Sequence, residues 1–228
     1  MDFWSVIYDM CEGFGVTLGL FALTLVLSIP LGLLFAFCSM SKFKPLSYLM
    51  KAIIWVVRGT PLLLQCIVIT FIPSTLFAVG NKQLAATLNL SIEGMQFVFV
   101  LVAFALNYAC YFAVIFEGGI KSIPKGQYEA GEVLGLSKKQ IFWRIILMQV
   151  IRRITAPMSN EVITLVKDTA LARALGVVEV ITVAYEKVNK YVILTPLLYA
   201  GIFYLLFSGL LTLLFHFLEK KLSYYQVT

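Results

Sequence analysis

Four long stretches of the chain contain no Asp, Glu, Lys or Arg, and this feature constrains the fold more than any other. They cover residues 13–41, 59–81, 94–116 and 191–218. Each has at least the roughly 20 residues that an α-helix needs to cross about 30 Å of hydrocarbon. Only 13% of the residues are charged, whereas about 25% are charged in a soluble domain. We therefore expect an all-α integral membrane protein.

A fifth stretch, 154–175, is mostly apolar but is interrupted by charged residues, namely Glu161, Lys167, Asp168 and Arg173. Charges at membrane depth are costly, so such a helix would turn them toward protein or water rather than lipid. The sequence thus predicts a single transmembrane domain over residues 1–228 with about five helices. Their expected bounds are about 13–38, 46–79, 95–118, 154–175 and 194–217.

The positions of Lys and Arg predict the orientation of the chain. With five spans, the loops and tail on one side would hold twelve of the 18 Lys and Arg residues, and the other side would hold three. Cytoplasmic loops carry an excess of these residues. We therefore expect the N-terminus outside and the C-terminus in the cytoplasm, because four or six spans would destroy the asymmetry.

The long cytoplasmic loop, about 117–153, has the pattern of ordered structure rather than of a linker. A short helix is predicted at 127–134, and Gly135 can end it with a positive φ. Ser137 and Gln140 are spaced as a capping box that begins a second helix. This helix–turn–helix is either a plain amphipathic hairpin on the membrane face or a docking element for a cytoplasmic partner.

The polar residues of the fourth predicted span share one helix face. At 100° per residue, an arc of about 120° holds Asn160, Glu161, Thr164, Lys167 and Asp168. Two interpretations stay open, and both can hold in different states. Lys167 can form an ion-pair network with Glu161 or Asp168, or pair with a neighbouring helix. Alternatively, the stripe lines a translocation path.

A helix break is predicted at Arg58-Gly59-Thr60-Pro61. Pro61 has no N–H to donate and its ring would clash with the carbonyl of residue 57, while Gly59 is conformationally permissive. In a membrane, freed backbone groups are tolerated only inside protein or beside a cavity. The segment is either a plain proline kink with Arg58 reaching the cytoplasmic interface, or an irregular stretch that brings Arg58 and Thr60 to the path.

Five residues of the cytoplasmic loop follow a recognisable spacing: Glu129, Ala130, Gly135, Ile145 and Leu147. The spacing resembles the EAA loop of ABC-transporter permeases, which reads Glu-Ala-Ala, three residues, Gly, nine residues, Ile-x-Leu-Pro. The chain departs from it at Gly131, in place of the second Ala, and at Met148, in place of Pro. The resemblance implies that Glu129, Ala130, Gly131 and Gly135 dock an ATPase.

Three further segments, 58–65, 107–109 and 160–171, are similar to motifs of the polar amino-acid uptake branch of these permeases. The resemblance covers roughly residues 57–176. It implies the permease subunit of an ATP-driven type I importer in a bacterial plasma (inner) membrane, forming the translocation path for a polar amino acid.

The same resemblance implies a set of partners. Two permease subunits, the second being a copy of this chain or a relative, would pair with a cytoplasmic ATPase dimer, and an external binding protein would deliver substrate. Because the chain has no G-x-x-x-x-G-K-[ST] motif, we do not expect it to be an enzyme. ATP and Mg²⁺ would belong to the ATPase. We expect no cofactor or metal in this chain, contact with membrane lipid, and no nucleic acid.

Two other functions compete with this one. A secondary transporter of a small polar solute also has broken helices and buried charges, but the small size of the chain and its EAA-like loop speak against it. A membrane-anchored sensor or structural subunit is the third possibility. A soluble ATPase that co-purifies with the chain would separate the first function from the others. Which amino acid is carried stays open.

Overall fold

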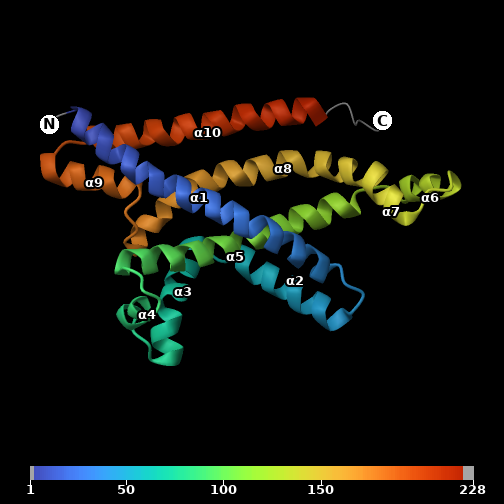
Figure 1. The fold of residues 1–228 in the computed structure, drawn as a ribbon, viewed down its shortest axis with the longest axis horizontal. Helices are drawn as coiled ribbons and strands as arrows, with labels where there is room; N and C mark the ends of the chain where they lie inside the picture. Colours follow the sequence, from blue (N-terminus) through green and yellow to red (C-terminus); the bar gives the residue numbers. More distant parts are fainter. Residues whose placement is uncertain (1–2, 223–228) are drawn as a thin grey trace.

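The computed structural model describes residues 3–222, and its regular structure in that range is entirely helical. Long helices run along the longest axis of the molecule, and α9 and α6 lie at its opposite ends (Figure 1). The most extensive contact joins α1 (Phe3–Ser39) to α5 (Ile92–Lys121). The expected all-α fold is confirmed.

Within residues 3–222, three helices are long and apolar enough to cross a membrane: α1, α5 and α10 (Thr195–Leu222). A bent pair, α2 (Lys44–Arg58) and α3 (Leu62–Phe77), adds a fourth span if the pair counts as one. The α1 helix begins ten residues earlier than predicted. The five-span count stays a prediction, because the remaining candidate carries several charges.

The predicted break at residues 59–61 is confirmed, and it divides the helix expected at 46–79 into α2 and α3. That the pair forms one span stays a prediction. The axes of α2 and α3 are bent by 110° at this point, so α3 leaves the bundle direction (Figure 1). Pro61 lies in the gap, with an extended backbone that begins α3. Because proline cannot donate to the preceding turn, the helix ends and restarts in a new direction.

The second helix of the predicted cytoplasmic loop runs into the predicted fourth span, and no break in the helix marks the expected boundary at residues 153–154. After α6 (Lys125–Val133), helix α7 (Lys138–Ile141) continues through a π-helical turn, Phe142–Ile146, directly into α8 (Leu147–Asp168). No glycine or proline interrupts the backbone between Lys138 and Leu147, so the second helix of the loop and the fourth span form one continuous rod.

The helical conformation changes where α8 ends. A 3₁₀ turn at Thr169–Leu175 follows α8 and is closed by Gly176, whose φ is +80°. The expected fourth helix, 154–175, is therefore α-helical only as far as Asp168.

Two short helices were not expected from the sequence. Helix α4 (Asn81–Thr87) lies between α3 and α5, and α9 (Val180–Tyr191) lies between the 3₁₀ turn and α10. Glu179 caps α9 by accepting hydrogen bonds of 2.8 Å from the backbone N–H groups of Ile181 and Thr182.

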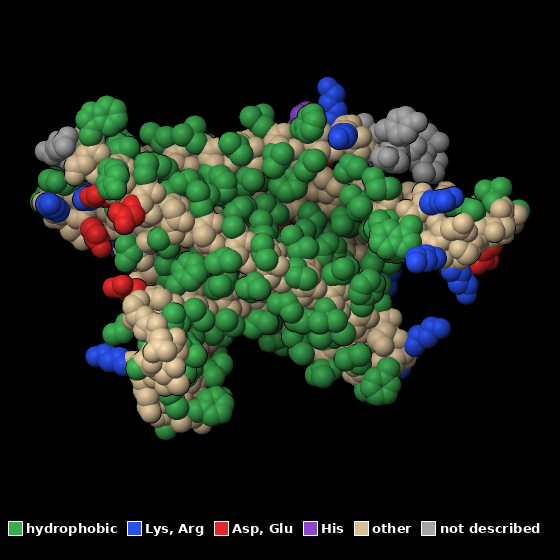
Figure 2. All heavy atoms as spheres, in the orientation of Figure 1, with side chains coloured by type: hydrophobic (Ala, Val, Ile, Leu, Met, Phe, Trp, Pro, Cys, Tyr) green, Lys and Arg blue, Asp and Glu red, His purple; other side chains and the backbone are tan. Residues whose placement is uncertain are grey.

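The core is centred on α5, and its largest fully buried side chains include Phe104, Tyr108 and Phe112. Outside the core, hydrophobic side chains cover most of the middle of the visible face (Figure 2). Most visible Asp and Glu side chains lie at the end with the N-terminus and α9, and most Lys and Arg at the end with α6 and α7. An apolar belt between two charged ends is the surface of a membrane protein.

Candidate functional site

A cavity of about 440 Å³ lies where the α2–α3 break meets α5 and the end of α8. Seven of its ten lining residues carry a polar side-chain group, although the surrounding helices are largely apolar. The lining residues are Thr60, Pro61, Leu62, Asn107, Tyr108, Tyr111, Glu161, Thr164, Asp168 and Leu171. A polar cavity among apolar helices is the arrangement expected of a path for a polar solute.

The first wall of the cavity is the break itself. The carbonyl of Val57, which a residue with an N–H at position 61 would have bonded, instead accepts a hydrogen bond of 2.7 Å from Nε2 of Gln65. The same nitrogen lies 2.8 Å from Oγ1 of Thr60. Gln65 thus replaces the donor that proline lacks and ties the first turn of α3 to the end of α2.

The second wall comes from α5. Asn107, only 4% exposed, donates from Nδ2 to Oε1 of Gln65 over 3.0 Å. Because Gln65 is held from both sides, its amide orientation is fixed. The buried asparagine therefore links the broken span to the central helix.

The third wall is the end of α8. The hydroxyl of Tyr108, which is 2% exposed, donates to Oδ2 of Asp168 over 2.7 Å. This bond fixes the carboxylate at the rim of the cavity, since a hydrogen bond to a charged acceptor is stronger than a neutral one. Two neighbouring residues of α5 therefore bond to two different elements of the cavity, Asn107 to α3 and Tyr108 to α8.

The remaining polar residues of α8 differ in how they are bonded. Thr164 donates from Oγ1 to the carbonyl of Asn160 over 2.9 Å, within its own helix. The half-buried Glu161 forms no hydrogen bond and no ion pair among the described residues. Glu161 therefore offers its carboxylate to the cavity without an internal partner.

The two edges of the predicted polar stripe on α8 have different surroundings. Glu161, Thr164 and Asp168 line the cavity, whereas Asn160 and Lys167 are exposed and do not. On a helical wheel, the latter two lie at the opposite edge of the arc from Glu161 and Asp168, by about 100°. In this chain taken alone, three of the five residues therefore share the cavity, and a common path for all five stays a prediction.

The predicted ion-pair network is absent from the part of the chain that the structure describes. In residues 3–222 the salt bridges are Lys121–Glu117 and Lys187–Asp9, neither of which involves α8. Asp168 is bonded to a tyrosine instead of to Lys167. Nor does any group of His, Cys, Asp and Glu in the described range have the arrangement of a metal site.

Of the two predicted residues at the break, only Thr60 lines the cavity. Arg58 is exposed, and its guanidinium carbon lies 5.0 Å from the centroid of the Tyr111 ring. This distance is within the range of a cation–π interaction. Arg58 therefore contacts the site through a lining residue rather than facing the cavity.

Sequence reasoning left four residues out of the site: Gln65, Asn107, Tyr108 and Tyr111. Three of them lie in the segments 58–65 and 107–109, which already stood out as motifs. Tyr111 could have been added, because residues three and four apart share a face of a helix.

The predicted docking segment lies at the opposite end of the molecule from α9 (Figure 1). Glu129 and Ala130 are exposed on α6, whereas Gly131 is buried. A Cβ at Gly131 would lie 2.7 Å from Cγ1 of Ile141, so glycine here lets α6 pack against α7.

The two turn signals of this segment are confirmed. Gly135 has a φ of +72°, and Ser137 and Gln140 form the predicted capping box.

Comparison with known proteins gives consistent matches. The family model described as "Binding-protein-dependent transport system inner membrane component" matches residues 28–224. The L-cystine transport system permease protein TcyB of Bacillus subtilis is 33% identical over 98% of this chain and 89% of its own length. The arginine transport system permease protein ArtQ of the same organism is 32% identical over 93% of this chain and 91% of its own length.

A solved structure also matches. A chain in the crystal structure of an amino acid ABC transporter with histidines superposes with a TM-score of 0.78 at 25% identity. The match covers 97% of this chain and 99% of that one.

Proposed function

Because the chain belongs to the family of binding-protein-dependent transport system inner membrane components and is the permease subunit of an amino-acid ABC importer, we propose that the cavity between α2–α3, α5 and α8 forms part of its translocation path. Family membership decides against the secondary transporter and the sensor. It also places ATP hydrolysis in a separate subunit.

The observation that carries the proposal is the convergence of polar groups from three helical elements far apart in sequence. Glu161 has no hydrogen-bond or salt-bridge partner among the described residues, and the carboxylate of Asp168 is held in place by Tyr108. Either carboxylate can accept a charge-assisted hydrogen bond from the α-ammonium group of an amino acid. Asn107 and Thr60 add neutral polar groups, which suits a polar substrate.

The exposed edge of the α8 stripe supports a second permease subunit. Asn160 and Lys167 lie on a helix of the proposed membrane domain, yet nothing in the described chain covers them. An amide and an ammonium facing lipid are costly. We infer that a copy of this chain or a relative packs there, so that Lys167 faces the path between subunits, where it can meet an α-carboxylate.

The experiment compares two variants of the complete importer, Glu161→Gln and Lys167→Met, by amino-acid uptake and by thermal stability together. Loss of a charge-assisted contact should raise the half-saturating substrate concentration for Glu161→Gln by about tenfold or more. The melting temperature should change little, because Glu161 has no internal partner to strand. Unchanged uptake kinetics with a large loss of stability in either variant would reject the role of these residues in the path. That result would favour a structural ion pair of the same side chain in the complete importer.

At the other end of the molecule, α6 and α7 are the proposed docking element for a cytoplasmic ATPase dimer that binds ATP and Mg²⁺. Glu129 and Ala130 are exposed and can contact the partner, while Gly131 and Gly135 shape the hairpin. Co-purification of a soluble ATPase with the wild-type chain, and its loss when 125–137 is replaced by a Gly-Ser linker, tests this role.

The proposed topology follows the Lys and Arg bias: five spans with α8 as the fourth, an outside N-terminus where the external binding protein delivers substrate, and a cytoplasmic C-terminus. Residues 1–228 then form a single permease domain. A tag at Met1 should be accessible to protease in intact spheroplasts, and a tag at Thr228 should be protected. Tags on the same side would refute the five-span count.

A further inference from the structure

A second cavity, of about 540 Å³, lies between α8 and α10, away from the polar one. It is a groove lined almost entirely by aliphatic, Met and Phe side chains. The lining residues are Met148, Ile151, Ile154, Thr155, Met158, Phe215, Leu218, Lys221 and Leu222. The hydroxyl of Thr155 donates to the carbonyl of Ile151 over 2.7 Å, so it offers no free donor to the groove.

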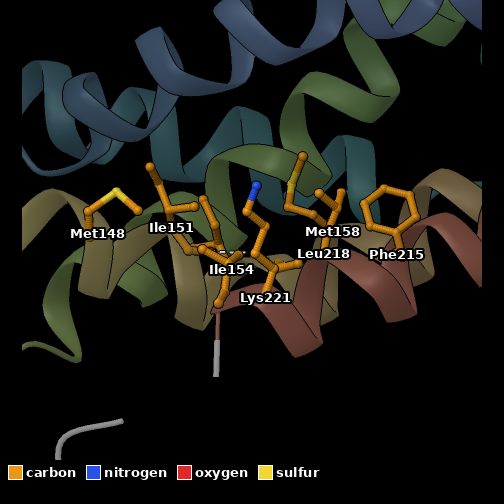
Figure 3. Close-up of a pocket in the computed structure, with 9 residues that line it drawn as sticks. Met148, Ile151, Ile154, Met158, Phe215, Leu218 and Lys221 are labelled. Atoms are coloured by element: carbon orange, nitrogen blue, oxygen red, sulfur yellow. Dashed lines mark hydrogen bonds between the residues drawn. The ribbon is translucent and has the colours of Figure 1, made fainter. Parts of the chain in front are cut away.

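One lining residue of this apolar groove, Lys221, is positively charged. Figure 3 shows the side chain of Lys221 reaching from α10 between Ile151 and Ile154 on one side and Met158 and Leu218 on the other. Neither salt bridge of residues 3–222 involves Lys221. The nearest carboxylate in sequence, Glu219, lies about 200° around the same helix. An anion from outside the described chain would therefore complete the groove.

The length of the groove indicates what kind of anion fits. Its α8 wall runs from Met148 to Met158, which is about 15 Å at 1.5 Å per residue. This is half of the roughly 30 Å hydrocarbon core of a bilayer. Because Arg152 and Arg153 lie in the same stretch of α8, the groove begins at the charged interface and reaches into the apolar region. Lys221 belongs to the basic last turn of α10, whose other cation is Lys220, so its ammonium enters the groove from the end of a helix long and apolar enough to cross the membrane.

We propose that this groove binds one anionic phospholipid, with an acyl chain along the apolar wall between α8 and α10 and the phosphate on the ammonium of Lys221. Apolar burial holds the chain, and the charge selects the headgroup. Because α8 also lines the polar cavity, the lipid would support the helix that carries Glu161 and Asp168. The site does not depend on which substrate is carried.

Native mass spectrometry of the purified importer tests the proposal. The delipidated complex is incubated with phosphatidylglycerol or phosphatidylcholine of identical acyl chains. The wild type should retain phosphatidylglycerol preferentially. Lys221→Gln should lower its retention about fivefold, the effect of one lysine at an anionic surface. Lys220→Gln, which changes the neighbouring charge outside the groove, is the matched control and should retain the lipid.

A groove-filling variant, Ile151→Trp, should reduce retention of both lipids while the complex stays assembled. Equal retention of the two lipids by the wild type, or equal losses in Lys221→Gln and Lys220→Gln, would overturn the proposal. So would lipid binding that requires removal of residues 223–228 or dissociation of the complex. The first would make the chain's own tail the occupant of the groove, and the second a partner subunit.

Discussion

The polar cavity and the α6–α7 hairpin both depend on a few specific contacts, but the contacting residues are separated by very different lengths of sequence. In the cavity, Asn107 is bonded to a residue 42 positions away, and Tyr108 to one 60 positions away. In the hairpin, the capping box spans three residues, and Gly131 meets Ile141 ten positions later. One region is defined by packing between helices, and the other by its own local sequence.

This difference implies that the two regions can be damaged separately. A change in the hairpin should alter its shape and its contact with a partner while the bundle stays intact. A change at one of the hydrogen-bonded residues of the cavity should strand a buried polar group and lower the stability of the bundle. The predictions below use this contrast, beginning with the largest expected effect.

The largest effect is expected from Gly135→Pro in the hairpin. Proline cannot adopt the φ of +72°, and it would lose the hydrogen bond from Gly135 N–H to the carbonyl of Glu132. Helix α7 would leave α6 in a different direction. Uptake and ATPase co-purification should fall to background, while membrane insertion and the melting temperature of the bundle persist.

The control for this change is Gly135→Asn, because asparagine tolerates the left-handed conformation. It should keep most of the uptake. Full uptake by Gly135→Pro would show that the hairpin does not govern coupling.

In the cavity, the largest loss of stability is expected from Gln65→Leu. The change removes the acceptor of the Asn107 amide and leaves the carbonyl of Val57 only the 3.3 Å hydrogen bond from Oγ1 of Thr60. A stranded buried polar group costs about 1–3 kcal/mol. The free energy of unfolding in detergent should fall by at least this amount, measured by thermal unfolding of the purified complex.

A double-mutant cycle with Asn107→Leu sharpens this result. Removing both amides takes away the stranded group on α5, so the double variant should lose less stability than the two single variants added together. Simple additivity would mean that the bond between α3 and α5 contributes nothing.

A smaller effect is expected from Tyr108→Phe, which removes the hydroxyl bonded to Asp168 and keeps the ring. One half-buried acceptor is left without its donor, at a cost of about 1 kcal/mol. Thermal stability is the measurement, and Tyr111→Phe is the matched control, since no side-chain hydrogen bond of Tyr111 occurs in the described structure. Equal losses in the two variants would contradict a specific role for the Tyr108–Asp168 bond.

The smallest effect is expected from Ser137→Ala, which removes the N-cap of α7. Loss of such a cap costs about 1 kcal/mol, and here the cost should be confined to one end of a helix. Hydrogen exchange should quicken at residues 138–141 while the exchange of α5 is unchanged. A drop in bundle stability as large as that of Tyr108→Phe would show that the hairpin and the bundle unfold together.

The local features of this protein follow from its sequence. The apolar stretches indicated the long helices, Pro61 indicated the break, and Gly135 with Ser137 and Gln140 indicated the turn and the capping box. Each of these signals acts within a few residues, through backbone geometry or through the cost of exposing apolar surface. For the same reason the direction of the chain after the break, a bend of 110°, was not predictable.

Only the tertiary structure decided which side chains share the cavity. The helical arc of α8 indicated five candidates, but packing against α5 gave three of them to the cavity and left Asn160 and Lys167 outside. Gln65, Asn107 and Tyr108 belong to the site through hydrogen bonds between distant parts of the chain. Asn107 and Gln65 are 42 residues apart, and Tyr108 and Asp168 are 60 residues apart. The periodicity of a helix determines which residues lie on one face, but the neighbouring helix that this face meets is determined by how the whole bundle packs.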